Sequence, residues 1–394
     1  MDSHGPTARR FPLVARFRPV CLPLPERLRT LVDLAGRAAQ QGEQGLASTV
    51  YNQSALLASD FGLPDFARSM CHRHANAYLR ACPLSAASAI RGLEPLVNLA
   101  RLQIRSGNTD DGRRRLLDLY EAVGSGNSVT FEAVTVPADL TRTAEDREEV
   151  RAWLWRVLLA DGTRTLTTTG RWREALAHIE EHRGIGIRML DGRQVAVVAA
   201  LTEGATERAS ELLNGTAPGD PWEQAVTACL TALCRRDAGP ETGDCMADLV
   251  DSYLSHEARP GMTVFDVRLG LTVLDAVAST ERSGARRLVG DLVRRTTAAR
   301  DGNAAREVLA AELFTVLATD DQVQECTDLV TACRLEGGLP LEELYAELAP
   351  GLDSSEAVIA RSLAATAAST ELLRRNFTTT TDAGPFGAEV RCPE

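Results

Sequence analysis

The feature that most constrains the fold is a glycine followed five positions later by a second small residue. The pattern occurs at Gly62 and Ala67, Gly107 and Gly112, Gly170 and Ala175, and Gly204 and Ala209. The last two glycines lie 34 residues apart, which is the length of a helix–turn–helix repeat unit. We therefore expect the chain to be a stack of helical hairpins.

The composition agrees with a helical fold. Aromatic residues make up only 5% of the chain, and runs of β-branched residues are scarce. Such a composition favours helices that pack through small side chains over a β-sandwich. At 394 residues the chain is long enough for two or three compact domains or for one long solenoid. We predict an all-α fold, an α-solenoid of helical hairpins.

The predicted organisation divides the chain into five segments. They are a disordered or extended arm over 1–23, N-terminal helical hairpins over 24–123, an irregular insert over 124–142, a continuing helical array over 143–376 and a disordered tail over 377–394. The insert is rich in β-branched residues, which leaves a short strand or hairpin open as an alternative to disorder. Towards the C-terminus we expect separate helices over 303–319 and 355–375, with Pro350 in a joint.

The best copy of the pattern reads Gly170-Arg171-Trp172-Arg173-Glu174-Ala175. It resembles the second helix of a tetratricopeptide repeat (TPR), which begins with glycine, an aromatic residue and alanine at these spacings. The resemblance covers residues 44–215, and only Trp172 supplies the aromatic residue. It implies a TPR-like right-handed superhelix with a concave groove, and it implies protein–protein interaction, with a peptide or protein partner bound in that groove.

In that family the first helix of each hairpin lines the groove. Transferred to this chain, the register implies that the groove is lined by Asn52, Leu56 and Ser59 in one hairpin and by Val97 and Arg101 in the next. Trp155 is a further candidate. Asn52 and Arg101 carry groups that bind a peptide backbone or a carboxylate. The expected role is a scaffold, adaptor or regulator with no catalytic residue and no cofactor.

Several other functions are disfavoured by the residue content. All 43 basic residues are arginine, so no lysine is present to form a Schiff base or to bind phosphate in a P-loop. The net charge of −11 disfavours nucleic acid as a partner. No apolar stretch is long enough to span a membrane, and no signal peptide is recognisable. The nine cysteines are odd in number and form no Cys-x-x-Cys, so we expect reduced thiols in a cytoplasmic protein.

One motif keeps an enzymatic alternative open. His178-Ile179-Glu180-Glu181-His182 has the His-x-x-Glu-His spacing of inverted zinc proteases, in which two histidines bind zinc and the glutamate acts as base. We expect His178 and Glu181 to face outward and His182 to pack between helices, so no metal site is assigned. The alternative is an all-α enzyme or biosynthetic accessory protein with an internal small-molecule or metal site. A sensory domain of a regulator and a homodimer through the C-terminal helices also remain open.

Overall fold

The computed structural model describes residues 1–239, 243–277, 282–335 and 341–378. Its first helices are α1 (Pro6–Arg10), α2 (Leu24–Gln41), α3 (Gln44–Asp60), α4 (Pro64–Leu79), α5 (Ala86–Arg105), α6 (Thr109–Ser125) and α7 (Ala144–Val157). A two-stranded hairpin, β1 (Val129–Phe131) and β2 (Val134–Val136), precedes α7. The chain continues through the π-helix η1 (Leu158–Gly162), α8 (Thr163–Thr167), α9 (Trp172–Glu181), α10 (Asp191–Thr202) and α11 (Thr206–Asn214). The remaining helices are α12 (Pro221–Ala238), α13 (Gly243–Ser255), α14 (Thr263–Val277), α15 (Arg282–Ala299), α16 (Gly302–Leu309), α17 (Glu312–Leu317), α18 (Asp320–Ala332) and α19 (Leu341–Thr378).

The four patterned glycines all lie in the turns of helical hairpins. Their φ angles fall between 72° and 88°, a left-handed conformation that glycine adopts without strain. The small residue five positions later is buried in each following helix, where it allows close packing. At Gly112 an added Cβ would come within 2.9 Å of the Ala100 carbonyl oxygen, which explains why alanine is replaced by glycine there. The all-α prediction is confirmed, with sequential helices packed on one another.

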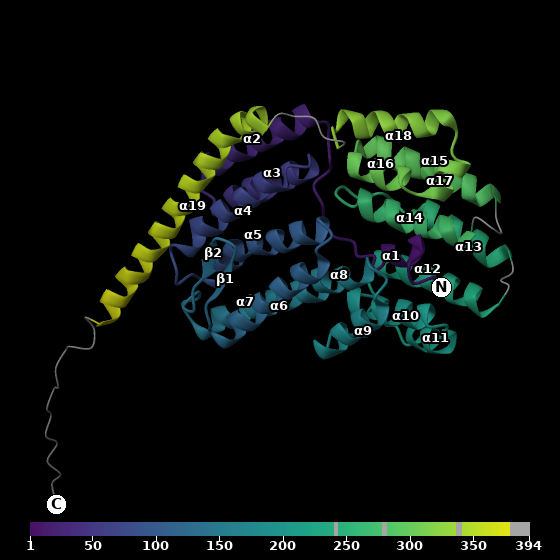
Figure 1. The fold of residues 1–394 in the computed structure, drawn as a ribbon, viewed down its shortest axis with the longest axis horizontal. Coiled ribbons are helices and arrows are strands. Elements are labelled where there is room, and N and C mark those ends of the chain that lie inside the picture. Colours follow the sequence, from purple (N-terminus) through teal and green to yellow (C-terminus); the bar gives the residue numbers. More distant parts are fainter. Residues whose placement is uncertain (240–242, 278–281, 336–340, 379–394) are drawn as a thin grey trace, which may run out of the picture.

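The helices form two groups that lie side by side (Figure 1). One contains α2–α7 and α19, and the other contains α8–α18; each group has its own apolar core. The chain crosses between the cores at η1, where Leu158 packs in the first core and Leu159 in the second. We call these groups the first half and the second half.

Each end of the chain packs into the opposite half. The arm, residues 1–23, runs between the two groups (Figure 1), and its Phe11, Leu13 and Cys21 are buried in the core of the second half. Helix α19 returns to the first half, where it contacts α2, α3 and α4. The Cys21 carbonyl accepts hydrogen bonds from the Gly302 amide (2.9 Å) and the Cys333 thiol (3.0 Å). Both halves are therefore completed by residues that are remote in sequence.

The insert at 124–142 is an ordered hairpin. Val129 pairs with Val136 and Phe131 with Val134 in antiparallel register, and three of these side chains are buried in the first core. Glu132, at the turn, accepts hydrogen bonds from Arg68 (3.3 Å) and Arg115 (2.7 Å). This segment therefore holds α4 and α6 together.

Three expectations from the sequence need correction. The arm is extended but packed inside the molecule, beginning with the short helix α1. The helix expected over 303–319 is divided into α16 and α17. Pro350 lies inside α19, because the packing of Leu348 and Leu352 against the first core offsets the backbone hydrogen bond that proline removes. Residues 379–394 of the expected tail lie outside the described part of the chain.

The apolar side of α19 is buried in the core of the first half. Leu344, Leu352 and Ile359 are at most 1% exposed because they already contact α2–α4.

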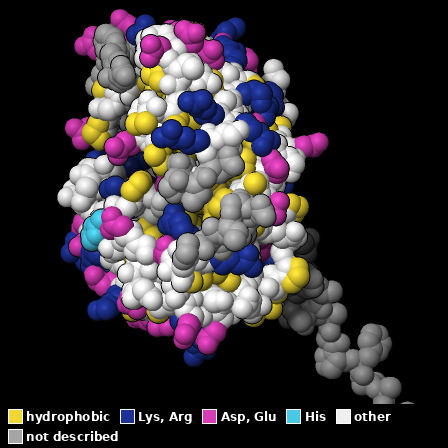
Figure 2. Space-filling view, turned by 90° about the vertical axis from the view of Figure 1, so that its right-hand side faces the viewer, with side chains coloured by type: hydrophobic (Ala, Val, Ile, Leu, Met, Phe, Trp, Pro, Cys, Tyr) yellow, Lys and Arg dark blue, Asp and Glu magenta, His cyan; other side chains and the backbone are white. Residues whose placement is uncertain are grey.

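Charged side chains of both signs are interspersed on the end of the molecule that Figure 2 shows. Within the ranges given above, no helix has the combination of length and hydrophobicity that crossing a bilayer requires.

The anchoring of the arm can be tested with two phenylalanines that lie in it. Phe11 is 1% exposed and Phe17 is 73% exposed. Phe11→Ala should lower the free energy of unfolding by about 3 kcal/mol or more, since a buried aromatic ring is lost. Phe17→Ala should change it by less than about 0.5 kcal/mol. Urea denaturation followed by circular dichroism measures both. Equal effects would mean that the arm is not anchored by its buried ring.

A buried carboxylate in the second half introduces a pH-dependent cost. Asp266, on α14, is 1% exposed, and neither carboxylate oxygen has a hydrogen-bond partner among the described residues. Burial raises the pKa of Asp266 to about 6, although the charges of Arg295 and Arg259 oppose the shift. The His256 Nε2 atom lies 3.7 Å from Asp266 Oδ1, and burial lowers the pKa of this histidine.

Because its folded-state pKa is raised, Asp266 destabilises the protein only where it is ionised. The cost is absent below about pH 4 and grows until about pH 6, above which it is constant. Asp266→Asn should therefore stabilise the protein at pH 7.5 by on the order of 2 kcal/mol, and by nothing at pH 4. Thermal unfolding across this pH range measures the difference. The exposed Asp248→Asn on α13 is the control, and a gain that does not depend on pH would contradict this account.

Candidate functional site

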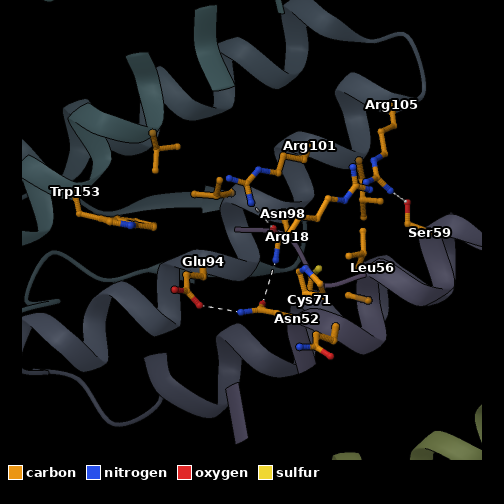
Figure 3. Close-up of a pocket in the computed structure, with 16 residues that line it drawn as sticks. Arg18, Asn52, Leu56, Ser59, Cys71, Glu94, Asn98, Arg101, Arg105 and Trp153 are labelled. Carbon is orange, nitrogen blue, oxygen red and sulfur yellow. Dashed lines mark hydrogen bonds between the residues drawn. The ribbon is translucent and has the colours of Figure 1, made fainter. Parts of the chain in front are cut away.

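A cavity lies between the first half and the arm. Its volume is about 440 Å³, and its walls come from α3, α5 and α7, with Cys71 of α4 and with Arg18 and Pro19 of the arm (Figure 3). On α3 the lining residues include Asn52, Leu56 and Ser59, which share one helix face because they are four and three residues apart. Glu94, Val97, Asn98, Arg101, Leu102 and Arg105 line it from α5.

Five of the six residues expected to line a groove are brought together here. Asn52, Leu56, Ser59, Val97 and Arg101 all border this cavity. Trp155 does not: its indole N–H donates to the His182 carbonyl (2.8 Å), and its ring packs against the second core. Trp153 lines the cavity instead, because two residues along a helix point to nearly opposite sides.

A chain of polar contacts crosses the floor of the cavity from α3 to η1 (Figure 3). The side-chain Nδ2 of Asn52 donates to the Glu94 carboxylate (2.8 Å), and the side-chain Nδ2 of Asn98 donates to Oδ1 of Asn52 (3.1 Å). Arg101 donates to Asn98 (3.0 Å) and forms a two-pronged ion pair with Asp161 at 3.1 and 2.7 Å. The sequence register did not identify Glu94, Asn98 or Asp161. Glu94 and Asn98 lie three residues before Val97 and Arg101, respectively, and line the same cavity from α5.

The pKa values of the two carboxylates in this chain of contacts shift in opposite directions. Burial raises the pKa of Glu94, since the amide of Asn52 is a weak substitute for water. Burial would also raise the pKa of Asp161, but the charge and hydrogen bonds of Arg101 outweigh it and hold the pKa below its usual value. Asp161 is therefore an ion-pair partner of Arg101, and Glu94 is the more easily protonated group.

A second cavity, of about 300 Å³, continues the first along the arm. The two share Arg18 and Arg101, and the second is also lined by Asp161, Arg164 and Arg268. Burial, with the charge of Arg268, lowers the pKa of Arg164 to about 10. The two cavities are neighbours along the arm, and we call them together the central groove.

The arm lies in the central groove as an extended chain held by its backbone. The Gln194 side chain accepts a hydrogen bond from the Leu13 amide (2.6 Å) and donates one to the Leu13 carbonyl (2.7 Å). Arg164 donates to the Pro12 carbonyl (3.0 Å). These contacts recognise main-chain atoms, as side chains in peptide-binding grooves do.

Of the motif residues, only His178 is placed differently from the sequence expectation: Glu181 is exposed, and the His182 ring lies against Tyr120 of α6. His178 is buried at 4% exposure, and its Nε2 atom lies 3.2 Å from the Leu158 carbonyl oxygen. His182, expected to pack between helices, is half-buried, with Nδ1 2.8 Å from the His178 carbonyl oxygen. No group of three His, Cys, Asp or Glu side chains with metal-binding geometry occurs in the described part of the chain.

Comparison with known proteins identifies no family. No family model matches the chain, and no curated protein matches it significantly. Among solved structures, it is similar to one described as a circular tandem repeat protein with novel repeat topology and enhanced subunit contact surfaces. That similarity covers 87% of this chain and 97% of the other, with 17% identity. The TM-score of 0.15 is too low to support an argument about fold or function.

The polar chain predicts a specific cost when its central amide is removed. Asn52→Ala leaves the Glu94 carboxylate without its donor, so the free energy of unfolding should fall by about 1–3 kcal/mol. Gln53→Ala is the matched control, because Gln53 lines the same cavity but has no hydrogen bond among the described residues. Adding Glu94→Gln to Asn52→Ala should recover part of the loss in urea denaturation. A comparable loss in the control would refute the role of Asn52.

Proposed function

We propose that this protein is a helical protein-interaction module that binds an extended segment of a partner in the central groove. It acts as a scaffold, adaptor or regulator and performs no chemistry of its own. The observation that carries the proposal is the shared cavity, in which side chains from two successive helical hairpins and α7 face one groove. The positive φ of the patterned glycines supports a TPR-like superhelix over part of the chain.

The way the arm is held supports an extended ligand. Arg164, which lines the second cavity, binds the Pro12 carbonyl, so this part of the groove already holds an extended segment of chain. Apart from the arm residues, Leu56 and Trp153 form an apolar part of the wall of the first cavity, and Asn52 and Arg101 contribute polar groups to it. Apolar wall with a few directional polar groups is the composition that peptide and ligand sites share.

The setting we propose is the cytoplasm. Seven cysteines in the described residues are free, and most of them are buried inside helices. Burial raises the pKa of Cys71 and Cys229 to about 12, so these thiols are unreactive packing groups.

A small-molecule site is the second candidate, and the dimensions of the first cavity favour it. A volume of about 440 Å³ lies within the range of small-molecule pockets, roughly 300–1,000 Å³. The arm covers one side, and Glu94 supplies a charged group with a raised pKa. In this case the protein would be an accessory protein or an enzyme whose reaction its residues do not identify.

Site-specific photocrosslinking in the native cell tests the first candidate. The full-length protein carries p-benzoylphenylalanine in place of Leu56, inside the cavity, or of Val32, an apolar residue on α2 that is 53% exposed and outside it. Irradiation should give a discrete protein adduct from position 56 and none from position 32.

Adducts of equal yield at both positions would refute a specific groove. If position 56 gives no adduct, native mass spectrometry of the full-length protein decides between the candidates. A stoichiometric small molecule that Leu56→Trp displaces would establish the second candidate in place of the first.

A further inference from the structure

The two ends of the first cavity differ in charge. Figure 3 shows the side chains of Arg18 and Arg105 extending toward each other beside Ser59, and all three residues line the cavity. Glu94 also lines it, about three turns of α5 before Arg105, which is about 16 Å along the helix axis. Apolar residues of α3, α5 and α7 line the same cavity: Ala55, Leu56, Val97, Leu102, Trp153 and Val157. The cavity therefore combines a cationic end, a distant carboxylate and apolar wall.

Arg18 and Arg105 are poorly supplied with carboxylate partners. Within the described part of the chain, the Arg18 side chain forms no hydrogen bond or ion pair. Arg105 donates to the Ser59 hydroxyl (2.6 Å) and lies 3.6 Å from the Asp60 carboxylate. Asp60 is also bound by Arg27 at 3.0 Å. Arg27 and Arg105 thus share one carboxylate, and Arg18 has none among the residues described.

The positive charge at this end of the cavity is suited to an anionic group. Arginine keeps its charge in proteins, so the two guanidinium groups do not become neutral by losing protons. Burial lowers the pKa of Arg105, and the charge of Asp60 only partly opposes this shift. A carboxylate between Arg18 and Arg105 can accept charge-assisted hydrogen bonds from both, and such bonds are roughly twice as strong as those between neutral groups.

We propose that the first cavity binds a monocarboxylate with an apolar body. The carboxylate lies between Arg18 and Arg105, and the body packs against Leu56 and the other apolar residues of the wall. A dicarboxylate is disfavoured, because its second charge would approach Glu94 and be repelled. The ligand is a free organic acid or a glutamate beside apolar residues in a partner segment. The inference rests on the proposed function, whose ligand site includes this cavity, and names the chemistry of the ligand.

Isothermal titration calorimetry of the full-length protein with octanoate tests the proposal. Octanoate should bind at one site per chain. Octanamide keeps the apolar chain but carries no charge, and it should bind about tenfold more weakly, since hydrogen bonds between charged groups are lost. Octanedioate, with a carboxylate at each end, should also bind more weakly than octanoate. Equal affinity for octanamide would overturn the role of the carboxylate, and equal affinity for octanedioate would overturn its placement away from Glu94.

The variant Arg18→Gln removes one of the two guanidinium groups. It should bind octanoate about tenfold more weakly than the parent. Without ligand its unfolding temperature should be no lower, because the Arg18 side chain has no partner in the part of the chain described. The matched control is Arg9→Gln, an exposed arginine of the same arm that lines neither cavity, and it should bind octanoate as the parent does. An unchanged affinity in Arg18→Gln would refute the site.

A peptide with blocked ends and one glutamate between leucines, compared with its glutamine counterpart, distinguishes the two sources of the carboxylate. Binding of the glutamate peptide that is tighter than that of octanoate, and is lost in the glutamine peptide, indicates a partner segment. Binding of octanoate that is at least as tight as that of the glutamate peptide indicates a free organic acid. These comparisons use the parent protein and do not depend on the folding of any variant.

If neither octanoate nor the glutamate peptide binds the parent protein, the inference is overturned. The proposed function fails separately, because crosslinking from position 56 does not require a carboxylate. Adducts without binding of either carboxylate would leave the interaction module in place and remove only this ligand chemistry. Octanoate binding without adducts would retain the carboxylate site and support the small-molecule candidate.

Discussion

The structure depends on where the two ends of the chain pack: the N-terminal arm packs into the second half, and the C-terminal helix α19 packs into the first. The arm supplies Phe11, Leu13 and Cys21 to the core of the second half, and α19 supplies Leu344, Leu352 and Ile359 to the core of the first. A simple stack of hairpins would expose an apolar face at each end, which is why such arrays usually carry capping units. Here the chain covers one such face with its own terminus and fixes the other terminus between the halves. The position of every element along the central groove follows from this packing.

The position of the arm also determines which side chains line the central groove. Because the arm passes between the halves, it adds Arg18 to a wall that α5 already furnishes with Arg101 and Arg105. Arg101 is neutralised by Asp161 across the junction at η1, whereas the Arg18 side chain has no ion pair in the described part of the chain, and only its backbone amide is bonded, to the Gly261 carbonyl. Arginine suits this setting since it stays charged when partly buried and offers several N–H donors in a fixed geometry. The groove thus combines an apolar wall, an amide-rich floor and one cationic end.

Agreement between sequence and structure is greatest where local rules control the geometry. Glycines such as Gly170 and Gly204 turn the chain because of their left-handed backbone conformation. Independently of these turns, helix periodicity places Asn52, Leu56 and Ser59 on one face of α3. Trp155, a candidate outside the repeat register, does not line the cavity because its indole N–H donates to the His182 carbonyl and its ring packs against the second core. Glu94 lies three residues before Val97, so helix spacing could have placed it on this face, but its role depends on burial and on its contact with Asn52. Asp161 could not be found from spacing, since it meets Arg101 from a different element.

Taken alone, the sequence determined the helical hairpins, their turns and the face that each early helix presents. These properties depend on backbone conformation and on a period of 3.6 residues, both of which are local. Tertiary structure decided that the arm is packed, that Pro350 lies within a helix and that Arg101 pairs with Asp161. Those outcomes depend on apolar burial and charge between residues up to about 300 positions apart, which no local pattern encodes.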